Sequence, residues 1–210
     1  MITRTLSLVA ALGIFAMASA PAMTVSSDHI GSVPVLLGVE KVRKELHINS
    51  LQKAVLDSLR DEYKASAQKL ANPMPQTKAE RDAAEAKLLA LNTRYNNRAL
   101  SVLNDTQRER FLEIEHQVLG ATHLYSTKVQ KKVGLTPEQV QQVEKIRQKG
   151  LVTVGKINHR FEDGKLDYQQ RLEALHKARL INDAALLKLL TPAQRTSFDA
   201  LGGKKVVTAI

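Results

Sequence analysis

One short motif occurs four times along this 210-residue chain, and it constrains the possible fold more than any other feature. Two clear copies are Leu135-Thr136-Pro137-Glu138-Gln139 and Leu190-Thr191-Pro192-Ala193-Gln194, and two looser copies are Ile48-Asn49-Ser50-Leu51-Gln52 and Leu103-Asn104-Asp105-Thr106-Gln107. Thr or Asn at the second position suits a helix N-cap, and Gln three residues later can accept from the backbone N–H of that cap. Proline in the clear copies suits the first helical position, where no N–H donor is needed. Each copy therefore predicts the start of a helix.

The spacing of the copies predicts a duplication. Gln52 and Gln107 are 107 − 52 = 55 residues apart, and Gln139 and Gln194 are 194 − 139 = 55 residues apart. A shift of 87 residues places the first pair of motifs on the second pair, and it also aligns Phe111 with Phe198. Similarity at a fixed offset is typical of repeated structural units.

The rest of the pattern predicts an all-α fold without strands. A second type of helix start, Thr77-Lys78-Ala79-Glu80, follows a proline-rich break at residues 72–75. On the helix expected at 137–161, apolar residues recur on one side: Val143, Ile146, Gly150, Val154, Ile157 and Phe161. We therefore expect two duplicated units, 35–120 and 121–201, each a long antiparallel helical hairpin with short flanking helices. The glycines at 202–203 predict a loose tail over 202–210.

The first 22 residues have the pattern of a secretory signal peptide. Arg4 precedes the apolar run from Leu6 to Ala18, and small residues follow it. Cleavage is expected after Ala22, which leaves residues 23–34 as a flexible leader and places the protein in the periplasm or outside the cell. An uncleaved membrane anchor is the alternative.

Charge is concentrated in the second unit. Residues 23–120 hold 14 Lys/Arg against 13 Asp/Glu, whereas residues 121–210 hold 16 against 8. Export and an aromatic content of 4% argue against nucleic acid as the partner of this basic half. Acidic polypeptides or an anionic membrane surface are the partners that the charge indicates. The chain has no cysteine, which excludes a disulfide framework.

A basic strip is expected on the 137–161 helix, on the side away from its apolar residues. It consists of Lys145, Lys149, Lys156 and Arg160, and we add Arg171, Lys177 and Arg179 of the following helix as candidate partner-binding residues. The alternative interpretation is an ordinary solvated outer face, because charged outer faces are the norm for helices.

The sequence does not predict an enzyme or a cofactor. It has neither a glycine-rich phosphate loop nor a Gly-x-Ser-x-Gly elbow, and no catalytic residue is assigned. His116 and His123 are weak metal-ligand candidates, because metal sites on helices use ligands four residues apart and these are seven apart. Asn104 matches a glycosylation sequon but is better explained as a helix cap.

The four motifs in an exported, helical, cysteine-free chain resemble the LTxxQ-motif (Spy/CpxP-like) family of bacterial periplasmic proteins. The resemblance covers residues 35–201, although Asn49 and Asn104 replace the threonine of the motif. It implies ATP-independent, chaperone-like binding of unfolded or partner polypeptides under envelope stress. It also implies the alternative of a metal- or stress-sensing adaptor of an envelope signalling system. Family members form a cradle-like homodimer with two motifs per chain, so the duplication predicts that one chain is a pseudo-dimer. A structural or membrane-surface protein is the third hypothesis.

Overall fold

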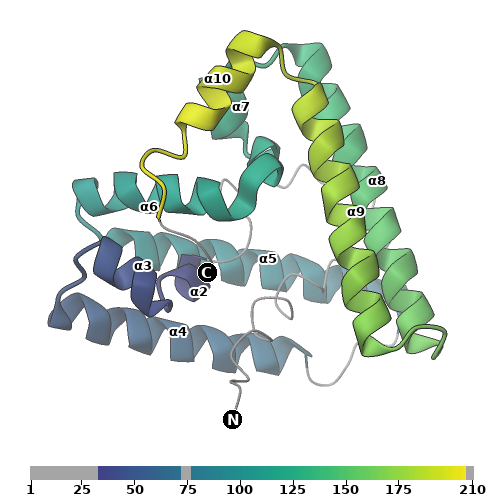
Figure 1. Cartoon of the computed structure of the whole chain (residues 1–210). Coiled ribbons are helices and arrows are strands. Elements are labelled where there is room, and N and C mark those ends of the chain that lie inside the picture. Colours follow the sequence, from purple (N-terminus) through teal and green to yellow (C-terminus); the bar gives the residue numbers. More distant parts are fainter. Residues whose placement is uncertain (1–32, 72–76, 207–210) are drawn as a thin grey trace. The chain divides into compact units, whose positions relative to one another are not determined.

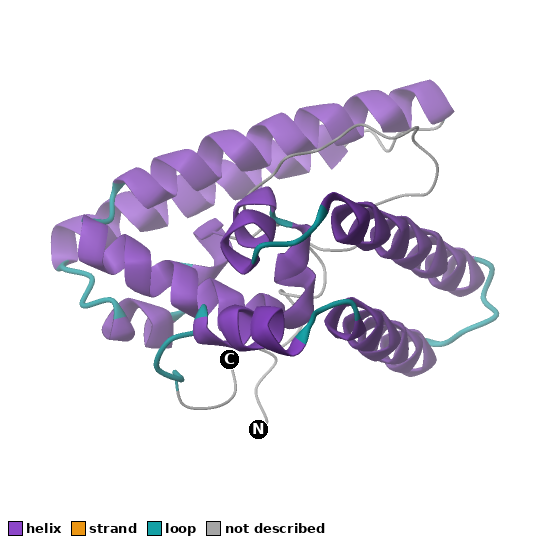
Figure 2. Cartoon of the chain, turned by 90° about the horizontal axis from the view of Figure 1, so that it is seen from above, coloured by secondary structure: helices purple, strands orange, loops and turns teal. Residues whose placement is uncertain are grey.

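The computed structural model describes residues 33–71 and 77–206, and every regular element in these ranges is a helix (Figures 1 and 2). The elements are α2 (Val33–Leu36), α3 (Glu40–Glu45), α4 (Ser50–Ala71), α5 (Lys78–Ser101), α6 (Asp105–Leu119), the 3-10 helix η1 (Gly120–Tyr125), α7 (Thr127–Val133), α8 (Pro137–Glu162), α9 (Tyr168–Lys188) and α10 (Pro192–Ala200). The predicted all-α class is confirmed. The expected signal peptide, its cleavage after Ala22, leader residues 23–32 and tail residues 207–210 lie outside these ranges. No helix within the described ranges is long and apolar enough to cross a bilayer.

The described residues form two compact units, 33–118 with 202–206 and 119–201. Val33, two residues before the expected boundary at residue 35, is fully buried in the core of the first unit. Before the first motif, the chain forms two short flanking helices, α2 and α3, with a break at residues 37–39. The break allows Leu36, Leu37 and Val42 all to be buried.

The first unit is built on the hairpin of α4 and α5, with α2 packed against both helices. Leu56, Leu59 and Tyr63 face its core from α4, and the ring of Tyr63 meets that of Tyr95 edge to face at 5.7 Å. The Tyr63 hydroxyl donates to Asn92 at 2.8 Å, and burial raises the pKa of Tyr63. The hydrogen bond between Tyr63 and Asn92 therefore joins α4 to α5 at the edge of the core.

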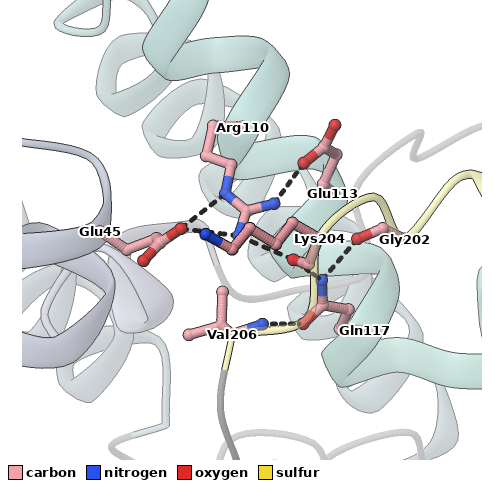
Figure 3. A network of polar contacts seen from close by, with 7 residues as sticks. All are labelled: Glu45, Arg110, Glu113, Gln117, Gly202, Lys204 and Val206. Atoms are coloured by element: carbon pink, nitrogen blue, oxygen red, sulfur yellow. Dashed lines mark hydrogen bonds and ion pairs between the residues drawn. The ribbon is translucent and has the colours of Figure 1, made fainter.

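The segment 202–206 is bound to α6 of the first unit, so the prediction of a loose tail is wrong for these residues (Figure 3). Gln117 donates to the carbonyls of Gly202 and Lys204 and accepts from the amide of Val206. Arg110 donates to the Lys204 carbonyl at 2.7 Å, and Val206 packs against the core of the unit. These bonds use backbone groups of the tail, which a side-chain pattern does not reveal.

Gly203 is required in this segment. Its φ is +54°, and a Cβ atom there would lie 2.2 Å from the carboxyl carbon of Glu113. Any side chain would therefore push Glu113 away from Arg110, with which it forms an ion pair.

The helices α8 and α9 form a hairpin and lie side by side in both views (Figures 1 and 2). The second unit has its own core, which lies near the start of α8 and the end of α9. Val143 of α8 and Leu186 of α9 are buried together with Phe198 of α10. The short elements η1 and α7 complete this core, with α10 packed on α7. Of the expected apolar stripe of α8, Val143 and Ile157 are buried and the other members are half-buried.

The two units contain the same order of elements at the 87-residue offset that the motifs predict. Corresponding elements start 87 residues apart for four pairs: α2 and η1 (33 and 120), α3 and α7 (40 and 127), α4 and α8 (50 and 137), and α6 and α10 (105 and 192). The long helices α5 and α9 end 87 residues apart, at 101 and 188, but start 90 apart. The pair that differs most in length is α6 and α10, which have 15 and 9 residues.

A matched pair of residues ends α3 and α7 in the left-handed region. His47 has φ +51° and Gly134, its equivalent at the offset, has φ +71°. The next amide bonds back across the turn in the same way in both units, from Ile48 to Arg43 and from Leu135 to Gln130, at 3.0 Å each. This arrangement is a helix C-terminal cap that favours glycine.

We expect His47→Gly to stabilise the protein by about 0.5–1 kcal/mol and Gly134→Ala to destabilise it by about 1–2 kcal/mol. The reason is that the left-handed conformation strains any residue with a Cβ atom. Urea unfolding followed by circular dichroism would measure both changes. Equal effects of the two substitutions, in either direction, would contradict the explanation.

Candidate polypeptide-binding surface

Each of the four motifs forms the two hydrogen bonds of a capping box. In the clear copies, Thr136 and Thr191 accept from the amides of Gln139 and Gln194, and each glutamine side chain accepts from the threonine amide. In the looser copies, Asn49 and Asn104 exchange the same bonds with Gln52 and Gln107. Asparagine therefore caps these helices as threonine caps the other two, and the hydrogen bonds of the capping box are kept.

The motif glutamines of each unit also bond to each other across 55 residues. Gln52 donates to Gln107 at 2.8 Å and accepts from it at 3.1 Å. Gln139 donates to Gln194 at 2.8 Å and accepts from it at 2.9 Å. We call each reciprocal pair a glutamine clasp. The equal 55-residue spacing was the sequence signal for this pairing, which the capping interpretation alone did not predict.

The clasps also bind backbone carbonyls at the ends of neighbouring elements. Gln52 and Gln139 donate to the carbonyls of Val102 and Leu189, which follow the two long second helices. Gln107 donates to the Leu46 carbonyl, and Gln194 donates to that of Gly134. The motifs therefore join two helix starts and two helix ends in each unit, which is a structural role with no reactive group.

The outer side of α8 carries the expected basic strip, and it is exposed. At about 100° per residue, Lys145, Lys149, Lys156 and Arg160 fall within roughly 80° of the helix circumference. All four side chains are exposed, and none forms an ion pair with a described residue. From 145 to 161 the sequence contains no Asp or Glu that could neutralise them.

Val152 lies at the edge of this strip. It is 51% exposed, and its position on the helix falls between those of Lys149 and Lys156. We call the five residues Lys145, Lys149, Val152, Lys156 and Arg160 the α8 face. On α9, Leu180 and Ile181 are 55% and 62% exposed, and Lys177 is exposed nearby on the same helix. The second unit thus shows apolar side chains beside uncompensated positive charge.

Two other predicted partner-binding residues have protein partners instead. Arg171 donates to Asn158 at 3.1 Å and lies 4.7 Å above the ring of Phe161, so its guanidinium is held within the hairpin. Arg179 is exposed and lies 3.6 Å from Asp183. Burial raises the pKa of Asp183, and the nearby Arg179 acts against this rise.

Asp163, which follows the end of α8, already forms an ion pair. Lys165 donates to Asp163 at 2.7 Å, and this bond, with a smaller contribution from His159, lowers the pKa of Asp163. Asp163 therefore stays ionised with its own lysine partner, and it leaves the charge of Arg160 uncompensated.

The two histidines considered as metal ligands are buried on different elements, His116 in α6 and His123 in η1. Within the described ranges, no group of three or more His, Cys, Asp or Glu side chains is arranged to hold a metal ion.

Comparison with protein-family models, with curated proteins and with solved structures found no match. What this protein binds is therefore inferred from its motifs and from the surface described above.

Proposed function

We propose that this protein binds unfolded or extended polypeptides in the bacterial envelope, in a chaperone-like and non-enzymatic manner. The observation that carries the proposal is the α8 face, where the exposed Val152 lies at the edge of a strip of four exposed cations. Uncompensated charge attracts an acidic chain over long range, and an apolar side chain then holds it weakly at short range. The resemblance to the LTxxQ-motif family supports the same function, and the signal-like N-terminus supports the location.

The proposal is tested by aggregation of a denatured acidic client, followed by light scattering at low ionic strength. We expect a several-fold molar excess of the protein to suppress the scattering. The double variant Lys149→Glu/Lys156→Glu should require roughly ten times more protein for the same suppression, because it cancels the net positive charge of the α8 face. Salt at about 1 M, where the Debye length is about 3 Å, should weaken suppression by the unmodified protein.

The matched control is Lys131→Glu/Lys132→Glu, which changes the net charge equally on exposed residues of α7. Its suppression should remain close to that of the unmodified protein. Equal losses in both double variants would show that net charge, and not the α8 face, is responsible. Val152→Ser should weaken suppression while leaving its salt dependence unchanged.

An anionic membrane surface is the second candidate partner, because the cations of the α8 face would also attract acidic lipids. Vesicles of phosphatidylglycerol and phosphatidylcholine distinguish the two partners. Co-sedimentation that depends on Lys149 and Lys156, together with no effect on client aggregation, would favour the membrane.

A further inference from the structure

The first unit contains a small basic hollow between α3 and the start of α4. Its lining residues are Glu40, Arg43, Lys44, His47, Ile48 and Lys53, and its volume is about 290 Å³. Ligand pockets in proteins range over roughly 300–1,000 Å³, so a hollow of this size suits a small ligand. None of these side chains belongs to a glutamine clasp or to the α8 face. Ile48 is the apolar first residue of a motif copy.

The charges of the hollow are unequal. Three cationic side chains line it, and Glu40 is the one carboxylate among the lining residues. Arg43 is buried and held in place, because it donates to the Leu37 carbonyl at 2.5 Å and to Asp57 at 2.6 Å. Lys44 and Lys53 are exposed and form no ion pair with a described residue, so their ammonium groups remain available to a ligand.

The second unit shows which of these residues the fold itself requires. At the 87-residue offset, Glu40, Arg43 and Lys53 correspond to Thr127, Gln130 and Val140, while His47 corresponds to Gly134. The helix ends there have the same backbone hydrogen bonds in both units. The fold can therefore be built with uncharged residues at these four positions, whereas Lys44 corresponds to another lysine, Lys131.

The backbone conformation of His47 is a second indication that the hollow binds a ligand. It keeps a left-handed backbone conformation, φ +51°, where the second unit uses glycine. A strained residue that persists at the rim of a hollow indicates a function for its side chain. An imidazole there can donate a hydrogen bond to a ligand between the two lysines.

We propose that this hollow binds a phosphate group. A doubly charged oxyanion fits the two available ammonium groups better than a single carboxylate does, because it carries more charge and more acceptor oxygens. The charge of Arg43 is already balanced by Asp57, so Arg43 contributes to the shape of the hollow and not to its net charge. Lys44 and Lys53 provide the charge, His47 provides a hydrogen bond, and Ile48 provides an apolar wall for whatever bears the phosphate. The phosphate belongs either to a free ion or to a lipid headgroup, and the experiment separates these sources.

The test is a titration of the purified protein with inorganic phosphate at low ionic strength, followed by NMR of the His47 and Lys53 amides. Sodium chloride at equal ionic strength is the reference. We expect saturable binding at one site, with a dissociation constant on the order of a millimolar or lower. Lys53→Val and His47→Gly, which introduce the residues of the second unit, should each weaken it by about tenfold or more. Lys131→Ala, at the second-unit equivalent of Lys44, should leave it unchanged.

Stability and binding separate the proposal from a structural explanation. His47→Gly should raise the unfolding temperature while weakening phosphate binding, so loss of binding cannot be attributed to unfolding. Phosphate shifts that do not saturate, or that are equal in Lys131→Ala and Lys53→Val, would overturn the proposal. Binding that both first-unit variants leave unchanged would also overturn it.

A second arm uses vesicles of phosphatidic acid in phosphatidylcholine, with pure phosphatidylcholine as control. Co-sedimentation that Lys53→Val abolishes and inorganic phosphate displaces would support a lipid headgroup as the source. Saturable binding of inorganic phosphate without such co-sedimentation would support a free phosphate or phosphate monoester.

Discussion

Replacing Gln107 with alanine is expected to destabilise the first unit by about 2–4 kcal/mol. The side chain of Gln107 is 9% exposed and takes part in several bonds at once. It accepts from the Asn104 amide at the start of α6, exchanges two bonds with Gln52 and donates to the Leu46 carbonyl at 3.0 Å. Alanine removes these side-chain bonds, although the backbone amide at position 107 can still donate to the Asn104 side chain. The substitution leaves buried polar groups without partners, and each such group costs about 1–3 kcal/mol. Urea unfolding with hydrogen exchange of α4 and α6 would measure the loss.

Three comparisons make this prediction specific. Gln142→Ala, at an exposed position of α8, should change stability by less than about 0.5 kcal/mol. Gln194→Ala should cost less than Gln107→Ala, because Gln194 is more exposed. A double-mutant cycle of Gln52→Ala and Gln107→Ala should give a coupling of about 1 kcal/mol or more. Additive effects of the two substitutions would show that the clasp is only a pair of independent caps.

Replacing Arg110 with leucine is expected to cost about 2–3 kcal/mol and to release residues 202–206 from α6. Arg110 is 17% exposed and donates twice to Glu45, at 2.9 and 2.6 Å, while also pairing with Glu113 (Figure 3). Burial would lower the pKa of Arg110, but the bonds to Glu113 and Glu45 outweigh it and raise the pKa. The charge is therefore fully committed to these partners and to the Lys204 carbonyl.

Hydrogen exchange at the amide of Val206, which donates to Gln117 at 2.9 Å, reports the release of the tail directly. The control is Arg195→Leu in the second unit, which removes an exposed ion pair with Asp199 at 2.9 Å. Exposed pairs contribute about 0–1 kcal/mol, so a small change is expected there. Unchanged exchange at Val206 in Arg110→Leu would show that the tail is held by Gln117 alone.

The sequence predicted most helix starts because the signals for them are local. Thr136, Thr191 and Thr77 each cap a helix where the motif and the capping box indicated, and α8 and α10 begin at the expected prolines. Asp167 caps α9 in the same way, and that helix begins at Tyr168. These are properties of four or five consecutive residues, which is why a single chain reveals them.

Contacts that are distant along the chain were harder to predict. The break between α2 and α3 depends on burying Leu36 and Leu37 together with Val42, and a local pattern does not show that. The tail was missed because its bonds are made by backbone groups at Gly202, Lys204 and Val206. The four cations of the α8 face were predicted from helical spacing, but the exposed Val152 beside them was not. The contacts of Arg171 with Asn158 and Phe161 were not predicted either.

The attachment of residues 202–206 to α6 has a consequence for how the chain matures. A ribosome completes residues 33–118 long before it adds the segment that supplies Val206 to their core. All of residues 119–201 are synthesised in the interval. The earlier-made unit must therefore stay incomplete until residues 202–206 have been synthesised, whereas the later-made unit has all of its own residues by then.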